Sequence, residues 1–468
     1  MPELESFERN LEAAFRAFAD RGVTPIDAVE FTSRVAVRRR RRWPLIVMPV
    51  PRLGWLLVVA ALLAALFASL LYAGAQRRDD RAPSAWTPVE VPTSGTRTPG
   101  ALGVSDVIRT PSGYLAVGYE DFDAATWTST DCLTWERVPP TDALQDASLY
   151  AVARAGDLYV GIGRGKLSAT DAPSPALWTS SDGRRWERVT PRVVSADGVG
   201  DELYANDIAA LGDLFVAVGG TKWGGGAWGR PAIWTSTDGR TWRAVSRFDP
   251  PLTDLVGDGW GWAMFTPIGA ITQVGPALMV AGAMGRGEAV WRSANGSSWT
   301  QVLGGDQAAG GVLRDIADAG DGTVVAIGNV RNTRSAASVW SPVLWWSRDG
   351  SAWSSVADMT AFADSYSGPD AHVRLTDVVR ADGSFVIVGS EPRSATAGTQ
   401  EWRGVVWTSA DGRTWSREAP DPVFEQAWLG KAFVCGDQLL VTGSTEGPNG
   451  SVAWARPLNS FGPQRPSR

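Results

Sequence analysis

The sequence predicts an all-β, seven-bladed β-propeller of four-stranded blades, preceded by a single transmembrane helix and a short cytoplasmic helical tail. The main observation is a nine-residue box, W-T-S-x-D-G-R-x-W, which is clearest at residues 234–242. Related copies place their second Trp at Trp135, Trp186, Trp242, Trp299, Trp353 and Trp415. A repeat of about 50 to 60 residues that contains several short strands is typical of propellers.

Each repeat also contains two apolar runs upstream of its box. Residues 375–379 and 385–389 are one such pair, and the Asp382-Gly383 between them is a strong hairpin signal. A glycine closes the second run in seven units: Gly118, Gly163, Gly219, Gly282, Gly328, Gly389 and Gly443. The seventh unit has no box, whereas residues 84–89 resemble the strand that follows each box. We therefore expect the N-terminal segment to complete blade seven and close the ring.

Charge is divided unevenly along the chain. Residues 1–81 carry 13 Arg and nine acidic residues, and the remainder carries 31 basic and 41 acidic residues. Such an acidic body argues against nucleic acid as a partner. Because the chain has two Cys and a single His, His372, a Cys and His metal cluster is excluded for the body. We expect neither a metal nor a cofactor.

Residues 53–75 form an uncharged apolar run of 23 residues. As a helix this run would measure roughly 34 Å, which is enough to cross about 30 Å of hydrocarbon. Arginines are concentrated on its N-terminal side, so the positive-inside rule places the N-terminus in the cytoplasm and the propeller outside the cell membrane. The alternative is a signal peptide cleaved after Ala75, but the preceding region and the apolar run are both longer than signal peptides usually have.

The remaining boundaries follow from composition. We predict a cytoplasmic tail over residues 1–42, with an amphipathic helix and an Arg-rich stretch, and a linker over 76–84. The propeller is expected at 85–458, followed by a loose tail at 459–468. The cytoplasmic segment would lie on anionic lipid or bind a cytoplasmic protein. Its layout resembles that of bacterial transmembrane anti-sigma factors, although it contains no motif specific to them.

The boxes resemble the Asp-box, or BNR, repeats of sialidase-like propellers. The resemblance covers roughly residues 85–456, and this chain has one residue fewer between the Asp and the Gly than the usual pattern. In such families the box forms a turn between the third and fourth strands of a blade, and its role is structural. The resemblance therefore implies turn-stabilising roles for Asp131, Asp182, Asp238, Asn295, Asp349 and Asp411.

Sialidases of this family bind a carboxylate with three Arg and use a Tyr nucleophile together with a Glu. Arg109, Arg314 and Arg374 fall in predicted inner strands of this chain, but the family's signature motif before the first blade is absent. We therefore assign no catalytic residue, and a sialidase-like glycosidase is the less favoured alternative.

Six tryptophans lie outside the repeat pattern, in the predicted connections opposite the boxes: Trp223, Trp228, Trp260, Trp262, Trp340 and Trp402. Several of them stand among glycines. Aromatic loops on a rigid scaffold are typical of sites for sugar rings or peptide anchors. The alternative is that these side chains fold back and cap the propeller.

Cys132 replaces the glycine of the first box, and Cys435 lies at a predicted turn on the same face of blade seven. Closure makes these blades neighbours, so a disulfide there would lock the ring. The two turns lie at different distances from the propeller axis, so the reach can also be too long for a bond.

Taken together, these features favour a non-enzymatic, membrane-anchored binding module for a glycan or protein ligand. The alternatives are a glycoside hydrolase that acts on envelope or extracellular glycans and a transmembrane sensor whose tail engages a cytoplasmic regulator. Fold alone does not decide among them, because propellers carry many functions.

Overall fold

The computed structural model describes residues 84–94, 102–166, 174–194, 203–222, 228–252, 268–285, 287–308, 310–332, 339–363, 373–393, 402–445 and 451–461. The chain divides into two compact units, Met1–Arg81 and Ala82–Arg468. The predicted cytoplasmic tail and the apolar run at 53–75 lie outside the described residues. Within the ranges given above, no helix has both the length and the apolar character needed to cross a membrane.

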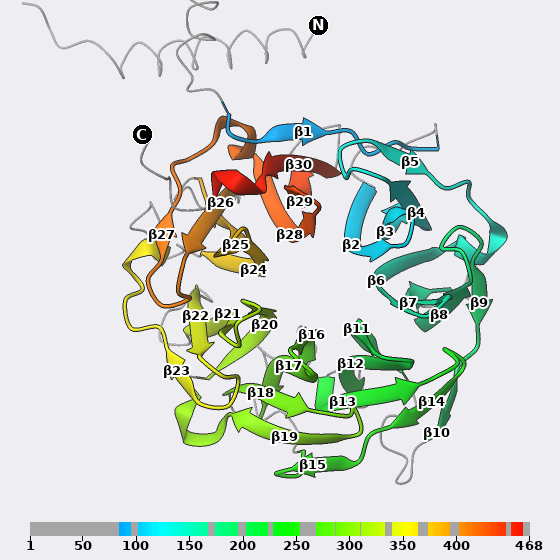
Figure 1. Ribbon diagram of the computed structural model, residues 1–468, viewed down its shortest axis with the longest axis horizontal. Coiled ribbons are helices and arrows are strands. Elements are labelled where there is room, and N and C mark those ends of the chain that lie inside the picture. The colour runs from blue at the N-terminus through cyan, green and yellow to red at the C-terminus, as the bar shows by residue number, and fades with distance from the viewer. Residues whose placement is uncertain are drawn as a thin grey trace, which may run out of the picture. The chain divides into compact units, whose positions relative to one another are not determined.

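The described part of the second unit forms seven sheets arranged around a central axis, so the predicted seven-bladed propeller is confirmed (Figure 1). Blade one contains β2 (Leu102–Thr110), β3 (Gly113–Glu120), β4 (Asp123–Ser129) and β5 (Trp135–Arg137). Blade two contains β6 (Ala147–Ala155), β7 (Leu158–Gly165), β8 (Ser174–Ser180) and β9 (Glu187–Val189). Blade three contains β10 (Arg192–Val194), β11 (Ala205–Leu211), β12 (Leu214–Lys222), β13 (Trp228–Ser236) and β14 (Thr241–Ala244).

Blades four to seven follow the same order around the ring. Blade four contains β15 (Arg247–Asp249), β16 (Ile268–Val274), β17 (Ala277–Met284), β18 (Gly287–Ser293) and β19 (Ser298–Leu303), and blade five contains β20 (Gly311–Asp318), β21 (Val324–Asn332), β22 (Val339–Ser347) and β23 (Trp353–Ser355). Blade six contains β24 (Arg374–Ala381), β25 (Ser384–Pro392), β26 (Trp402–Ser409) and β27 (Ser416–Arg417). Blade seven contains β28 (Ala427–Cys435), β29 (Gln438–Thr445), β30 (Ser451–Pro457) and β1 (Thr87–Val89). Single 3-10 turns occur at η1 (Asp142–Leu144), η3 (Gly305–Gln307), η4 (Thr360–Phe362), η5 (Pro422–Phe424) and η6 (Leu458–Ser460).

Two blades differ from the predicted four strands. In blades three and four, β10 and β15 each add a fifth strand parallel to the outer strand of the sheet, β14 and β19 respectively. Each added strand comes from the connection that leads out of the preceding blade. Both are only three residues long, so they carry too few positions to show an alternating apolar pattern in the sequence.

The ring closes through the N-terminal strand. β1 pairs antiparallel with β30, with Thr87 opposite Ala455 and Val89 opposite Ala453. The preceding Trp86 is buried against Phe424, with ring centroids 5.4 Å apart. One outer strand of blade seven therefore comes from the N-terminal end of the propeller, which leaves no open seam between the first and last blades.

The innermost strands all contain a β-bulge, and the bulge explains the recurring glycine. In blade one the register shifts between Val104 and Asp106, and in the opposite strand a Cβ on Gly118 would lie 1.9 Å from the carbonyl oxygen of Gly103. The same approach occurs in blade six, where a Cβ on Gly389 would lie 2.2 Å from the carbonyl oxygen of Arg374. Any larger residue at these positions would force the bulged strand away.

The core consists of apolar layers between adjacent blades. In one layer, Val160 and Leu177 of blade two pack with Phe215, Trp234 and Trp242 of blade three. The first Trp of each well-formed box is fully enclosed, as at Trp127, Trp178, Trp234, Trp291 and Trp407. Since a Trp buries roughly 150–250 Å² of surface, this repeated residue supplies much of the contact between blades.

Candidate functional site

The six boxes form tight turns at one face of the ring, which we call the Asp-box face. In the third box, Oδ1 of Asp238 accepts hydrogen bonds from the amides of Arg240 (2.8 Å) and Thr241 (2.7 Å). Asn295 does the same in the fourth box through its amide oxygen, which accepts from Ser297 and Ser298 at 2.9 and 3.0 Å. The oxygen at this position therefore caps the turn whether or not it carries a charge.

These turns also determine how the box carboxyls ionise. At Asp131, Asp238 and Asp349, amide hydrogen bonds hold the pKa below the usual aspartate value. At Asp182 and Asp411 desolvation opposes this effect, but the amides still keep the pKa low. Each of these carboxylates is engaged by its own turn and is a poor candidate for proton transfer.

Cys132 and Cys435 form a disulfide, with Cα atoms 5.9 Å apart. Cys132 lies in the first box with a positive φ of 60°, where the other boxes have glycine, and Cys435 ends the innermost strand of blade seven. Both side chains are buried. The bond covalently joins the two blades between which the ring closes.

Four aspartates occupy the residue that follows the bulge in innermost strands: Asp106, Asp207, Asp315 and Asp377. Each connects its blade to the next one. Oδ2 of Asp106 accepts from the amide of Val152 at 2.9 Å, and Oδ2 of Asp207 accepts from Ile271 at 2.9 Å. In the same way Asp315 accepts from Val378 at 2.7 Å, and Asp377 accepts from Ala432 at 2.9 Å.

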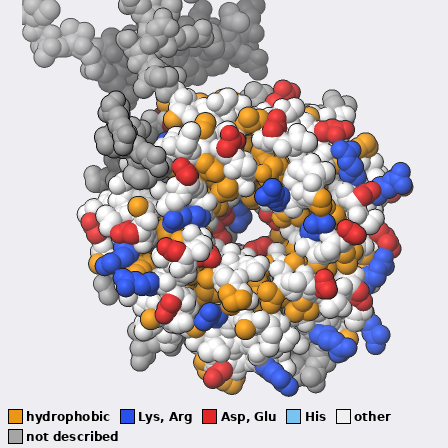
Figure 2. Space-filling model, viewed as in Figure 1, with side chains coloured by type: hydrophobic (Ala, Val, Ile, Leu, Met, Phe, Trp, Pro, Cys, Tyr) orange, Lys and Arg blue, Asp and Glu red, His pale blue; other side chains and the backbone are white. Residues whose placement is uncertain are grey.

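Lys431 occupies the equivalent position in blade seven and supplies the opposite charge. Its Nζ lies 2.7 Å from Oδ1 of Asp377, and 41% of its side chain stays accessible. Its strand, β28, lies at the inside of the ring, beside the central opening (Figure 1). Burial opposes the charge of Lys431, but Asp377, Asp315 and Asp207 together raise its pKa above the ordinary lysine value. Figure 2 shows acidic and basic side chains at the wall of this opening.

The carboxyls in this ring are difficult to ionise. Burial, and after it the negative charge of Asp207, raises the pKa of Asp106 to about 7, although Lys431 and the amides of Val152 and Val107 act in the opposite direction. Burial also raises the pKa of Asp207. Burial and the neighbouring Asp377 raise the pKa of Asp315 well above its usual range.

A second cluster lies on the opposite side of the ring, which we call the loop face, where β24 and β26 begin. Here Trp402 and Trp428 meet edge to face, with ring centroids 4.8 Å apart and an interplanar angle of 81°. The guanidinium of Arg374 lies over both rings, at 5.1 Å from the centroid of Trp402 and 5.4 Å from that of Trp428. All three side chains are half-buried. We call this group the Arg374 site.

The tryptophans predicted from the sequence are only partly brought together. Trp223, Trp260 and Trp262 lie outside the described residues, as does His372. The backbones of Trp228 and Trp340 lie in β13 and β22, because the hairpins extend further into the predicted connections than expected. Of the six, Trp402 is the one whose side chain is described, and its neighbours Arg374 and Trp428 come from two different blades.

The three arginines compared with a sialidase clamp do not meet. Arg109 pairs with Tyr114 beside the turn between β2 and β3, at the Asp-box end of the strand. Arg314 lies in β20, close enough to Arg374 that burial and this second positive charge lower its pKa to about 10. A three-arginine clamp is therefore not assembled from these positions.

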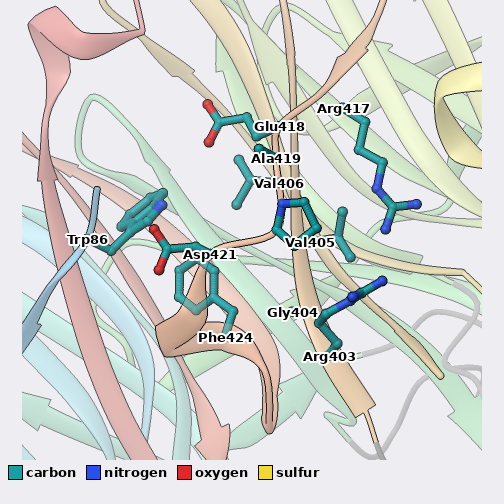
Figure 3. Close-up of a pocket in the computed structure, with 11 residues that line it drawn as sticks. Trp86, Arg403, Gly404, Val405, Val406, Arg417, Glu418, Ala419, Asp421 and Phe424 are labelled. Carbon is teal, nitrogen blue, oxygen red and sulfur yellow. The ribbon is translucent and has the colours of Figure 1, made fainter. Parts of the chain in front are cut away.

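A small pocket at the junction of blades six and seven is a structural joint (Figure 3). Its charged groups are already paired, since Arg403 and Arg417 both contact the buried Glu391. The carboxylate of Asp421 accepts from Ser84 and Ala85 at 2.7 and 2.9 Å, which anchors the start of the closing strand. The residues of this pocket hold the closing strand in place, and its charged side chains are already paired with one another or with neighbouring groups.

These features define a seven-bladed propeller built from BNR-like repeats. No protein-family model matches the sequence, and no curated protein matches it either. Among solved structures, the chain is similar to one described as YCF48 bound to D1 peptide, with 16% identity, 82% of this chain and 98% of that chain covered, and a TM-score of 0.47.

Two carbohydrate-active enzymes show a comparable likeness. A mutant of Trypanosoma rangeli sialidase that displays trans-sialidase activity has 11% identity and a TM-score of 0.42, with 82% of this chain and 58% of that chain covered. Penicillium chrysogenum alpha-L-arabinanase complexed with arabinobiose has 12% identity and a TM-score of 0.41, with 69% and 97% covered. At such identities the likeness concerns the fold alone, and the function has to be argued from the site.

Proposed function

We propose that this protein is a non-enzymatic binding module whose propeller presents the loop face to a protein or glycan ligand. The observation that carries the proposal is the Arg374 site, where a guanidinium and two half-buried indoles meet at the start of strands from adjacent blades. Trp and Arg dominate the energetics of many recognition surfaces, because each combines a large contact area with a specific polar group.

We further propose that the propeller lies outside the cell membrane and that residues 53–75 anchor it there. The sequence supports this location through the apolar run and the arginines that precede it. The Cys132–Cys435 disulfide supports it independently, because such bonds persist in oxidising compartments and are rare in the cytosol.

The binding role can be tested with the full-length protein, purified in detergent and applied to glycan and peptide arrays. Trp402→Ala/Trp428→Ala should abolish the array signal while circular dichroism and the melting temperature show a folded propeller. Phe122→Ala is the matched control, because Phe122 is an aromatic side chain, 80% exposed, at the loop face of blade one. Equal binding by all three proteins would refute the location, and no binding by any of them would refute the proposal.

A second candidate function, glycoside hydrolysis, is favoured by one specific observation. Burial and the neighbouring Asp377 raise the pKa of Asp315, and glycoside hydrolysis requires one carboxyl that stays protonated to act as the general acid. However, both carboxyl groups accept hydrogen bonds from backbone amides of the next blade, and Asp377 also pairs with Lys431. Both groups therefore already have partners within the propeller. Release of a chromophore from nitrophenyl glycosides by the wild type, lost in Asp315→Asn, would favour this alternative.

A further inference from the structure

Resting on the proposed binding role, we infer that the Arg374 site takes the carboxylate of a protein segment, with Trp402 and Trp428 contacting the apolar part of that segment. The planar guanidinium can bind a carboxylate through two parallel hydrogen bonds, and this is a common use of arginine in recognition. The inference follows from three properties of the site: no carboxylate of the described residues pairs with Arg374, Arg314 lies nearby, and the two indole rings have a particular arrangement.

The charge of Arg374 is not balanced by a nearby carboxylate in the described ranges. Burial alone lowers the pKa of Arg374, with no acidic group contributing, and its Nε is buried without a hydrogen-bond acceptor there. The neighbouring Arg393 and Arg403 differ, because each lies within 4 Å of a Glu425 oxygen, at 3.6 and 3.7 Å. A partly desolvated cation without an anion is costly, so an incoming carboxylate would be favoured at Arg374.

A second positive charge strengthens this preference. Arg314 of the adjacent blade feels the charge of Arg374, which contributes to lowering its pKa to about 10. Two guanidinium groups that repel one another are both stabilised when an anion approaches them. The sequence beyond residue 81 has an excess of acidic residues, so this basic spot contrasts with the charge of the propeller as a whole.

The ring arrangement favours a peptide over an acidic sugar. Sugar binding by Trp relies on an open indole face against which a pyranose ring can stack. Here the guanidinium already covers a face of each indole, and the edge of one ring meets the other. Ring edges and a cation instead suit an irregular contact with an acidic or C-terminal residue and its apolar neighbour.

The test uses the full-length protein and an array of hexapeptides synthesised in matched pairs. Members of one set of pairs differ only in a free or amidated C-terminus, and members of the other differ only in an internal Glu or Gln. We expect the wild type to bind acidic members at least about tenfold more tightly than their neutral partners, which is typical of one charged hydrogen-bonding contact. Which set shows the difference identifies whether the carboxylate is terminal or on a side chain.

Two substitutions separate recognition of the carboxylate from general loss of the surface. Arg374→Met should bring the ratio of acidic to neutral peptide affinity close to one, whatever the change in the affinity for neutral peptides, and Arg374→Lys should keep part of the preference. Peptide binding with no acidic preference in the wild type would overturn this inference but leave the binding role intact. An unchanged preference in Arg374→Met, or stronger capture of acidic glycans than of acidic peptides, would also overturn it, whereas absence of all binding would remove both proposals.

Discussion

The disulfide between Cys132 and Cys435 offers a direct measure of how strongly ring closure stabilises the propeller. Replacing both cysteines in Cys132→Ser/Cys435→Ser removes a crosslink between residues 303 positions apart. In the chain-entropy model, closing a loop of this length lowers the entropy of the unfolded chain by about 19 cal/mol/K, or about 5.7 kcal/mol at 25 °C. Measured contributions are usually smaller, so we expect a loss of about 4 kcal/mol in the free energy of unfolding.

The assay is thermal unfolding followed by Trp fluorescence, with and without reductant. Domains of nearly 400 residues unfold with an entropy of about 0.8 kcal/mol/K, so a loss of about 4 kcal/mol lowers the midpoint by about 5 °C. The reduced wild type should unfold near the midpoint of the double variant, and reductant should leave the variant unchanged. A difference of less than 1 °C between the unfolding midpoints of the oxidised and reduced wild type would refute the argument that this disulfide stabilises the closed ring.

Three further predictions concern the buried charges and the boxes. Lys431→Met should lower the free energy of unfolding by about 2 kcal/mol in denaturant titrations, a figure reduced from that of a fully buried pair because the lysine is partly accessible. The folded-state pKa of Asp106 is about 7, above its unfolded value, so the stability that protonated Asp106 contributes is lost as pH rises from about 4 to 7. The wild type should therefore have a higher melting temperature at pH 5 than at pH 8, and Asp106→Asn should reduce this difference. Asp238→Ala should cost about 1–2 kcal/mol because it removes the acceptor of two hydrogen bonds that hold the turn, whereas Asp238→Asn should cost much less, as the natural Asn295 indicates, when both variants are compared by thermal unfolding.

The repeated parts of the fold could be predicted from the sequence because each repeat uses the same local chemistry. The box requires a small hydroxyl, a turn-capping oxygen and an aromatic ring at fixed spacing, and the bulge requires a glycine opposite it. The bulge with its glycine recurs in all seven blades and the box in six of them, and this repetition reveals the number of blades. The closing strand was predicted for the same reason, since the segment at Trp86 carries the pattern of a blade's outer strand.

The non-repeated parts could not be predicted in this way. The added strands β10 and β15 depend on how a connection runs along the next blade, which leaves no regular pattern in the sequence. A signal for the inner carboxylates was present, because Asp106, Asp207 and Asp377 each stand 12 residues before a closing glycine. The sequence alone does not explain this spacing, because its cause is a contact in space: the bulge places each carboxylate beside a backbone amide of the neighbouring blade.

The inner ring and the loop-face cluster are connected through the same strands. Arg374 lies three residues before Asp377 in β24, and Trp428 lies three residues before Lys431 in β28. The Asp377–Lys431 pair and the hydrogen bond from Ala432 therefore hold together the two strands that carry the cation and one of the indoles. A recognition site loses affinity when its groups must first be ordered. The Asp377–Lys431 pair, three residues along the two strands, would therefore help to preserve the spacing between the Arg374 guanidinium and the Trp428 ring. The Asp377–Lys431 pair would thus support the geometry of the proposed binding site without being part of it.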